Sequence, residues 1–297
     1  MQVIYSPKYL NYYFEEGHPF WPERAGLFIE LLEKNKFSHQ LINPGRATDE
    51  DILLVHTRFY LQKLKDLANG GGGYLSIDTP VHKNNLEAAY YSVGGTILAA
   101  ELALKGETVI NTLGGLHHAE SNASSGFCIF NDHAIAIRKL QRRGKIKKAA
   151  VLDLDVHAGN GTQEIFYTDP NVLKISLHQD PTNFYPGTGF PQQTGEKAGK
   201  GFNINIVLKP GTGEKIYLEK LNQILPKISE YKPDLLLVII GVDTYKNDPL
   251  ASIKLKKQTY GKIAQRLNQF DKKGILFAGG YSKDTPFLWF EIINNLD

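Results

Sequence analysis

Cysteine is almost absent from this chain of 297 residues, which has one, at position 128. A single cysteine excludes a disulfide within the chain and fits a reducing compartment. We expect Cys128 to be a small buried apolar side chain rather than a nucleophile. Long apolar runs are also absent, since the longest, 235–240, is far too short to cross a bilayer. Residues 1–13 show no signal peptide pattern, so we expect a soluble, cytoplasmic protein that has no membrane partner.

An excess of charge of one sign is lacking too. Lysine and arginine number 34 against 31 aspartates and glutamates, a net charge of +3. This is too small to argue for a nucleic-acid partner by itself. Two short lysine clusters, at 145–148 and 254–257, are more typical of solvated helix ends than of a binding patch. We therefore predict no nucleic-acid partner.

Short apolar segments alternate along the chain with longer segments of helical pattern. Strands are predicted over residues 108–111, 149–154, 172–177, 202–207, 235–240 and 275–278. Helices are predicted over residues 86–104, 132–143, 162–167, 214–229 and 256–271. Such alternation indicates an α/β protein whose mostly parallel sheet has helices on both faces. The length and the lack of a linker predict one domain over residues 1–297.

Acidic residues and a histidine alternate where one predicted strand ends. Asp153, Asp155 and His157 share a spacing of two, and alternate side chains of a strand point to one face. Unpaired carboxylates are too costly to bury in an apolar strand, so they need a cation or dense hydrogen bonding. A carboxylate beside an imidazole suits Zn²⁺, or Fe²⁺ or Co²⁺ in the same site.

Further polar residues follow other predicted strands, and parallel sheets bind ligands beyond their carboxyl ends. Asp243 is either a cap of the following turn or a third metal ligand, which would complete a catalytic type of site with Asp155 and His157. His117 and His118 follow another strand. Imidazoles there suit proton transfer near neutral pH, and Asp153 could hold the second ring nitrogen of one of them.

Tyr281 follows two glycines after the last predicted strand. Its hydroxyl could donate to a polarised carbonyl oxygen, although a tyrosine is more often a packing residue. Tyr74 also follows glycines, but it precedes every strand that has a proposed ligand, so we prefer Tyr281. Gly126-Phe127 and Tyr185 place aromatic rings beside glycines, where they pack in a core or line a narrow apolar channel.

Together these segments resemble the zinc-dependent histone deacetylase superfamily, which includes acetylpolyamine amidohydrolases and bacterial acetoin-utilisation proteins. The resemblance runs from about residue 17 to residue 281, in the family's order and with family-like spacing. The matching segments are Gly115-Leu116-His117-His118-Ala119, Gly126-Phe127-Cys128, Asn131-Asp132, Asp153-Leu154-Asp155-Val156-His157, Tyr185-Pro186-Gly187-Thr188-Gly189, Gly241-Val242-Asp243 with Asp248-Pro249-Leu250, and Gly279-Gly280-Tyr281. The resemblance implies the three-layer αβα arginase–deacetylase fold with a mostly parallel central sheet.

The resemblance also implies site roles. The metal ligands would be Asp155, His157 and Asp243, and the metal Zn²⁺ or Fe²⁺. His118 would be the general base, His117 its electrostatic partner, and Tyr281 the group that polarises the carbonyl. The substrate would be held by Gly126, Phe127, Tyr185, Leu250 and, by a looser alignment, Asp78. A structural K⁺ would be held by carbonyls of Asp153, Asp155, His157 and Leu177 with the Ser176 hydroxyl.

In motif detail the chain resembles class IV-like bacterial members. Asn160 stands where many members have an aspartate that pairs with the general-base histidine, and a neutral amide leaves that histidine less basic. His18-Pro19-Phe20, and Ala278 before the final Gly-Gly-Tyr, also resemble class IV. Leu250 occupies a rim position where polyamine-selective relatives can have an acid, which disfavours a polyamine without excluding it.

The favoured function is metal-dependent hydrolysis of an N-acylated amine, above all acyl-lysine in a protein. The alternatives are an amidohydrolase of acetylpolyamines or other small amides, a catalytically silent metal-binding module, and a binuclear manganese hydrolase like arginase. The last needs a second acid, which 157–160 lacks. Acyl-chain length stays open, and long fatty-acyl groups are one option. We expect a monomer, because no long dimerising insertion is present.

Overall fold

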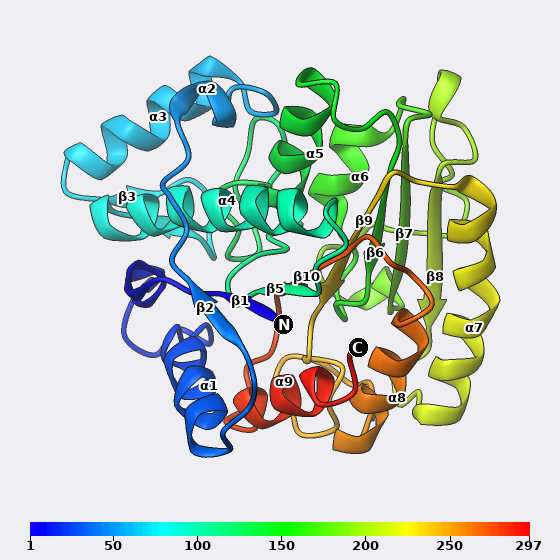
Figure 1. Ribbon diagram of the computed structural model, residues 1–297. Coiled ribbons are helices and arrows are strands. Elements are labelled where there is room, and N and C mark those ends of the chain that lie inside the picture. The colour runs from blue at the N-terminus through cyan, green and yellow to red at the C-terminus, as the bar shows by residue number, and fades with distance from the viewer.

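A computed structural model describes all 297 residues and contains one large parallel sheet. Its eight strands have the order β2-β1-β5-β10-β9-β6-β7-β8 (Figure 1). Every neighbouring pair in it is parallel. The strands are β1 (Gln2–Ile4), β2 (Gln40–Ile42), β5 (Val109–Asn111), β6 (Ala149–Asp153), β7 (Val172–Gln179), β8 (Asn203–Leu208), β9 (Leu235–Ile240) and β10 (Lys273–Phe277). A small antiparallel pair, β3 (Gly73–Tyr74) with β4 (Pro80–Val81), stands apart.

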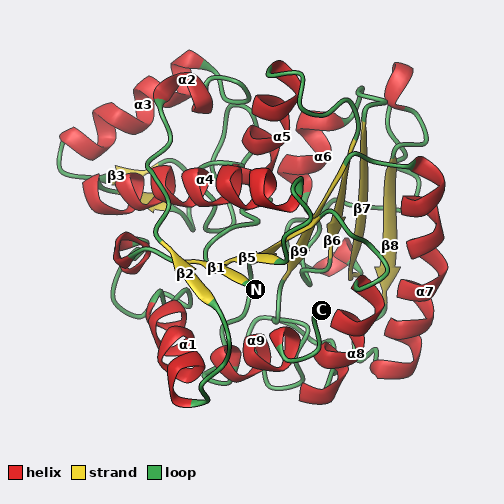
Figure 2. Ribbon diagram, in the orientation of Figure 1, coloured by secondary structure: helices red, strands yellow, loops and turns green.

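Helices cover both faces of the sheet (Figure 2). They are α1 (Glu23–Lys34), α2 (Asp49–Ile52), α3 (Arg58–Asn69), α4 (Lys83–Ala103), α5 (Asp132–Arg142), α6 (Asn160–Phe166), α7 (Glu214–Tyr231), α8 (Lys257–Leu267) and α9 (Thr285–Ile293). No helix among them is both long enough and apolar enough to span a membrane.

Alternation along the strands builds two apolar cores. Ala149 and Val151 of β6 pack with residues of α3, α4 and α5 on one face. Ala150 and Leu152 of the same strand pack with α1, α7, α8 and α9 on the other. Successive strand side chains point to opposite faces, so a buried parallel strand must be apolar at every position. The result is the three-layer αβα arrangement that the sequence predicts.

All six predicted strands are present, and each of their bounds lies within two residues of the prediction. The five predicted helices are present as well. The sequence analysis missed β1 and β2, whose three residues each are too few to show a period, and it missed α1, α3 and α9.

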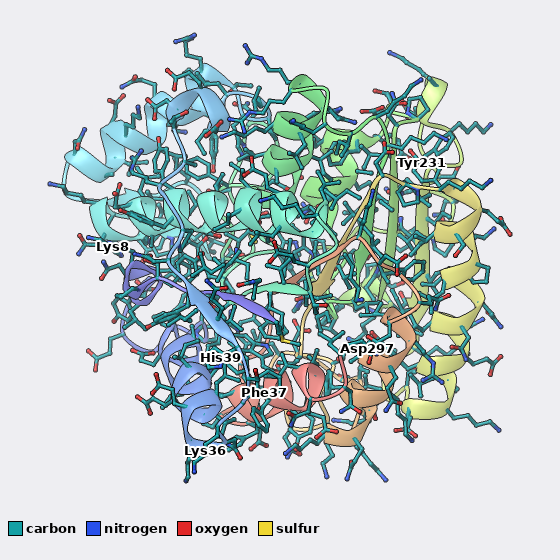
Figure 3. All side chains as sticks on the ribbon, viewed as in Figure 1. Lys8, Lys36, Phe37, His39, Tyr231 and Asp297 are labelled. Atoms are coloured by element: carbon teal, nitrogen blue, oxygen red, sulfur yellow. The ribbon has the colours of Figure 1, made fainter.

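The end of the sheet opposite the site is closed by ordinary packing. Tyr231 lies at the end of α7 (Figure 3). Its ring packs on Phe202, and its hydroxyl donates to the Pro170 carbonyl at 2.8 Å. These residues precede β7, β8 and β9. The predicted site residues lie instead beyond the carboxyl ends of the strands.

An aromatic cluster joins α1 and α9 to the sheet and provides a test of this packing. Phe28 is fully buried, with its ring centroid 5.6 Å from that of Phe277 and 5.7 Å from that of Trp289. We predict that Phe28→Ala lowers the free energy of unfolding by about 3–5 kcal/mol, because it leaves a cavity. Phe287→Ala is the matched control, since that side chain is 49% exposed. Urea unfolding curves measure both, and equal losses would contradict the packing described.

Candidate metal centre and active site

Four neighbouring strand ends bring the predicted site residues together. β5 leads to His117 and His118, β6 leads to Asp155 and His157, β9 leads to Asp243, and β10 leads to Tyr281. These four strands lie side by side in the order β5-β10-β9-β6. The sheet therefore gathers residues that are up to 164 positions apart in the chain.

Asp155, His157 and Asp243 form a buried cluster in which one ligand atom from each lies within 4.8 Å of the others. The Nδ1 atom of His157 is 3.1 Å from Oδ1 of Asp155 and 3.3 Å from Oδ2 of Asp243. The backbone amides of His157, Val156 and Gly279 donate to these carboxylates. The donor set, two carboxylates and one imidazole, is one that Zn²⁺ binds.

Two observations indicate that this cluster fits a cation. Oδ2 of Asp243 is buried and has no hydrogen-bond partner in the protein. A Cβ atom at Gly279 would stand far inside van der Waals contact with Oδ2 of both Asp243 and Asp155, so only glycine leaves that space open. A buried acceptor without a partner is costly, and a bound cation removes that cost.

Burial and neighbouring charged groups shift the pKa values of all three residues. Burial lowers the pKa of His157, but the adjacent carboxylates of Asp155 and Asp243 outweigh it and raise the pKa to about 10. Burial and then the Asp155 carboxylate raise the pKa of Asp243 to about 8. Burial opposes ionisation of Asp155, yet His117 and His157 hold the pKa of this carboxyl well below its usual range.

His117 is paired with an aspartate, as the sequence predicts for one of the two histidines. Its Nδ1 is 2.7 Å from Oδ2 of Asp153, and its Nε2 is 3.7 Å from Oδ1 of Asp155. Burial favours neutral imidazole, but Asp153 and Asp155 together raise the pKa of His117. This ring is therefore the one that readily carries a proton.

His118 has a neutral partner. Its Nδ1 is 2.7 Å from Oδ1 of Asn160, whose Nδ2 donates to Oε1 of Glu120 at 3.0 Å. Since an amide oxygen only accepts, Nδ1 of His118 donates and its Nε2 keeps a free lone pair. Burial, followed by the charges of His117 and His157, holds the pKa of His118 well below the ordinary value. His118 is therefore a neutral imidazole with a basic nitrogen free.

Tyr281 is held by a carboxylate that the sequence analysis did not single out. Oδ2 of Asp248 accepts the backbone N–H groups of Tyr281 at 2.7 Å and Ser282 at 3.3 Å. Burial, Asp155 and Asp243 raise the pKa of Tyr281 well above 10, so the hydroxyl keeps its proton at neutral pH. The ring of Phe127 packs edge-on against it at 5.8 Å.

Two more buried residues hold the site, and the sequence analysis assigned neither of them a role. Oδ2 and Oδ1 of Asp132 accept the amides of Gly115 and Leu116 at 2.9 and 2.7 Å, which fixes the loop that carries both histidines. Nη1 of Arg24 donates to the Gly280 carbonyl at 2.7 Å, next to Tyr281. Each acts through backbone groups of distant loops, which no local sequence pattern reveals.

A cavity of about 290 Å³ leads from the surface to the cluster. Its walls contain all five predicted substrate-binding residues together with site residues: Asp78, His118, Gly126, Phe127, His157, Asn183, Phe184, Tyr185, Leu250 and Tyr281. Gly126 has a φ of +55°, and a Cβ there would collide with the His118 ring, so glycine is required. The ring of Phe184 stacks on that of His157 at 4.8 Å, a contact the sequence did not identify.

Asp78 lines this cavity, and both of its carboxylate oxygens accept hydrogen bonds from other residues of the protein. Its Oδ2 accepts the Gly126 amide at 3.0 Å, and its Oδ1 accepts the hydroxyls of Ser76 and Thr79 at 2.9 Å. Tyr74, the tyrosine we set aside, is not among the lining residues and is 57% exposed.

A second, inner cavity lies behind the cluster and measures only about 20 Å³. Its walls include Arg24, Leu113, Leu116 and Cys128. Cys128 is buried, its Sγ lies 3.2 Å from the Gly126 carbonyl oxygen, and burial raises the pKa of its thiol well above the usual value. A space of this size has room for about one water molecule.

Comparisons with known proteins agree with one another. Residues 18–289 match the sequence model of the histone deacetylase domain. A probable deacetylase of Methanothermobacter thermautotrophicus is 40% identical over 289 residues, covering 96% of this chain and 87% of that protein. The crystal structure of the HDA15 HD domain superposes with a TM-score of 0.91 at 28% identity, covering 99% of this chain and 90% of the other. The acetylpolyamine aminohydrolase of Burkholderia pseudomallei gives a TM-score of 0.90 at 26% identity, covering 99% and 98%.

The space at Gly279 leads to a test of the cation site. We predict that Gly279→Ala lowers Zn²⁺ affinity by roughly tenfold or more, because the methyl group displaces the ligating carboxylates. Gly26→Ala is the control, since a Cβ there meets no atom closer than 3.7 Å. Calorimetric titration of metal-free protein with Zn²⁺ measures both affinities. Unchanged binding by Gly279→Ala would rule out this cluster as the metal site.

Proposed function

Because the chain belongs to the histone deacetylase family, and is on that ground a hydrolytic deacetylase, we propose that it removes the acyl group from acyl-lysine side chains. The observation that carries this proposal is the Asp155-His157-Asp243 cluster, whose His157 lines a cavity together with His118 and Tyr281. Three protein ligands leave a coordination position open, as catalytic zinc sites do.

In this proposal Asp155, His157 and Asp243 hold Zn²⁺, which when bound polarises the acyl carbonyl and makes water more acidic. Nε2 of His118 takes the proton of the attacking water. His117, whose pKa is raised by Asp153 and Asp155, stabilises negative charge and supplies a proton to the leaving amine. The Tyr281 hydroxyl donates to the carbonyl oxygen as negative charge develops there. Fe²⁺ suits the same ligands.

The mouth of the cavity supports a peptide substrate over a polyamine. Asp78 is the one acid among the lining residues, and both of its oxygens already accept hydrogen bonds. Leu250 adds an apolar group there. A free polyamine carries several ammonium groups that require anionic partners, whereas acyl-lysine places only an apolar stem in the cavity. Hydrolysis of acetylpolyamines is the second candidate, because a relative of nearly the same fold is an acetylpolyamine aminohydrolase.

The inner cavity supports a short acyl group. The acyl chain extends past the carbonyl toward the space bounded by Leu113, Leu116 and Cys128, which is about 20 Å³. A methyl group fits there and a long fatty-acyl chain does not. We therefore propose acetyl-lysine as the substrate.

The residues of the proposed structural K⁺ site also fit a cation. Nε2 of His178 lies 2.9 Å from the Gly189 carbonyl, which can only accept, so Nδ1 of His178 accepts the Ser176 hydroxyl at 2.7 Å. This leaves the Ser176 oxygen lone pairs free. β-Sheet pairing places Ser176 directly opposite Asp153. A single domain over 1–297, a monomeric state and a cytoplasmic location stay predictions of the sequence.

The Tyr281 hydroxyl provides the first test. We predict that Tyr281→Phe lowers kcat on an acetyl-lysine peptide by about 10²–10³, because a donor to the developing oxyanion is lost. KM should change little. Tyr74→Phe loses the same group at an exposed position and should keep wild-type kcat. Steady-state kinetics of the zinc-loaded proteins measure both, and full activity of Tyr281→Phe would reject the proposed role.

A substrate panel tests the acyl and amine assignments separately. We predict that kcat/KM on peptides falls from acetyl- to octanoyl- to myristoyl-lysine, because the inner cavity is small. Leu116→Ala enlarges that cavity and should raise the octanoyl-to-acetyl ratio. N-acetylspermidine should be hydrolysed more slowly than the acetyl peptide. Faster hydrolysis of myristoyl-lysine or of acetylspermidine would overturn the corresponding assignment.

A further inference from the structure

An amide stands between His118 and the carboxylate of a loop glutamate. Oδ1 of Asn160 is 2.7 Å from Nδ1 of His118, and Nδ2 of Asn160 is 3.0 Å from Oε1 of Glu120. Glu120 follows the His117-His118 pair by two residues, and both Asn160 and Glu120 are half-buried. The three side chains form a line from the cluster toward the protein surface.

The side-chain amide of Asn160 could by itself face His118 with either its oxygen or its NH₂ group. If it turned over, its NH₂ group would face Nδ1 of His118, and the imidazole would have to accept there and carry its proton on Nε2. That tautomer has no free lone pair for a proton of water. Asparagine alone does not choose between the two orientations, whereas an aspartate at the same position would have no such choice.

The geometry points to Glu120 as the residue that makes this choice. A carboxylate only accepts hydrogen bonds, so Glu120 keeps the NH₂ group of Asn160 toward itself and the amide oxygen toward His118. Glu120 is thus a positioning residue that sets the tautomer of His118 through Asn160. The consequence for turnover rests on the proposed function, in which His118 is the base.

The glutamate is held firmly enough for this role. Its backbone carbonyl accepts Nδ1 of the buried His56 at 3.0 Å, and Nε2 of His56 accepts the Asn131 amide at 3.0 Å. The Glu120 amide donates to the Ala123 carbonyl at 2.9 Å. Because the Asn131 amide can only donate, His56 also has one fixed tautomer.

The line also has an electrostatic effect. When His118 gains a proton, the amide dipole of Asn160 has its oxygen toward the imidazolium, and the Glu120 carboxylate polarises that amide further. The Glu120 carboxylate thereby stabilises the His118 imidazolium through Asn160, more weakly than a carboxylate bonded directly to the ring would.

Glu120→Ala tests the role of the carboxylate. We expect kcat on the acetyl-lysine peptide to fall about tenfold, the size of one hydrogen bond to a charged group, with KM nearly unchanged. Glu164→Ala is the matched control. The side chain of Glu164 accepts hydrogen bonds from the amide and hydroxyl of Ser121 in the same loop and makes no side-chain hydrogen bond with Asn160. Equal kinetics of the two variants would overturn the inference.

The Asn160→Asp background gives a result that a merely structural role would not. An aspartate bonds His118 without ambiguity, and its charge opposes that of Glu120. We expect Glu120→Ala to leave kcat unchanged or to raise it in that background. A tenfold loss there, as in the wild type, would show that Glu120 only supports the loop.

Histidine ¹⁵N NMR of the zinc-loaded proteins separates this inference from the proposed function. We expect His118 of the wild type to be protonated on Nδ1 only, and to show both tautomers in Glu120→Ala. Glu120→Gln, which keeps the size of the side chain, should show both as well because it can donate or accept. A pure Nδ1–H tautomer in both variants would overturn the role of Glu120. Absence of turnover by the wild type would instead reject the proposed function and leave the NMR result standing.

Discussion

The constraint on which this site depends is that carboxylates buried at the ends of a parallel sheet must each find positive charge. Asp132 and Asp248 satisfy it with backbone N–H groups, and Asp153 does so with His117. Asp155 and Asp243 share a single imidazole, and one oxygen of Asp243 is left without a hydrogen-bond partner. The negative charge that the protein does not neutralise therefore lies on the Asp155 and Asp243 carboxylates, where a divalent cation would neutralise it.

The same network assigns different chemical states to two adjacent histidines. His117 and His118 follow one another in the chain and have ring centroids 4.1 Å apart, yet their partners are a carboxylate and an amide. The carboxylate raises the pKa of His117, and the charge on that ring helps to depress the pKa of His118. Environment rather than residue type therefore shifts the pKa values of the two imidazoles in opposite directions.

Much of this arrangement was predictable because it depends on local patterns in the sequence. The apolar strands and the alternating Asp153, Asp155 and His157 reveal the sheet and the edge where the site lies. The roles of Asp248, Arg24 and Glu120 were not predicted, since each acts on a group far away in the sequence or on a backbone amide. The two shortest strands, β1 and β2, escaped it because their place depends on pairing with neighbours rather than on a period of their own. The small inner cavity also depends on packing between distant loops.

β10 is the last strand in the sequence but lies inside the sheet rather than at its edge. This last strand lies between β5 and β9, so its two neighbours cannot be joined through hydrogen bonds until residues near 277 have been synthesised. Without β10, the strand that leads to His117 and His118 and the strands that lead to Asp155, His157 and Asp243 belong to two parts of the sheet that no strand pairing joins. Tyr281 follows β10 directly, so the strand that closes the sheet also brings the final catalytic candidate.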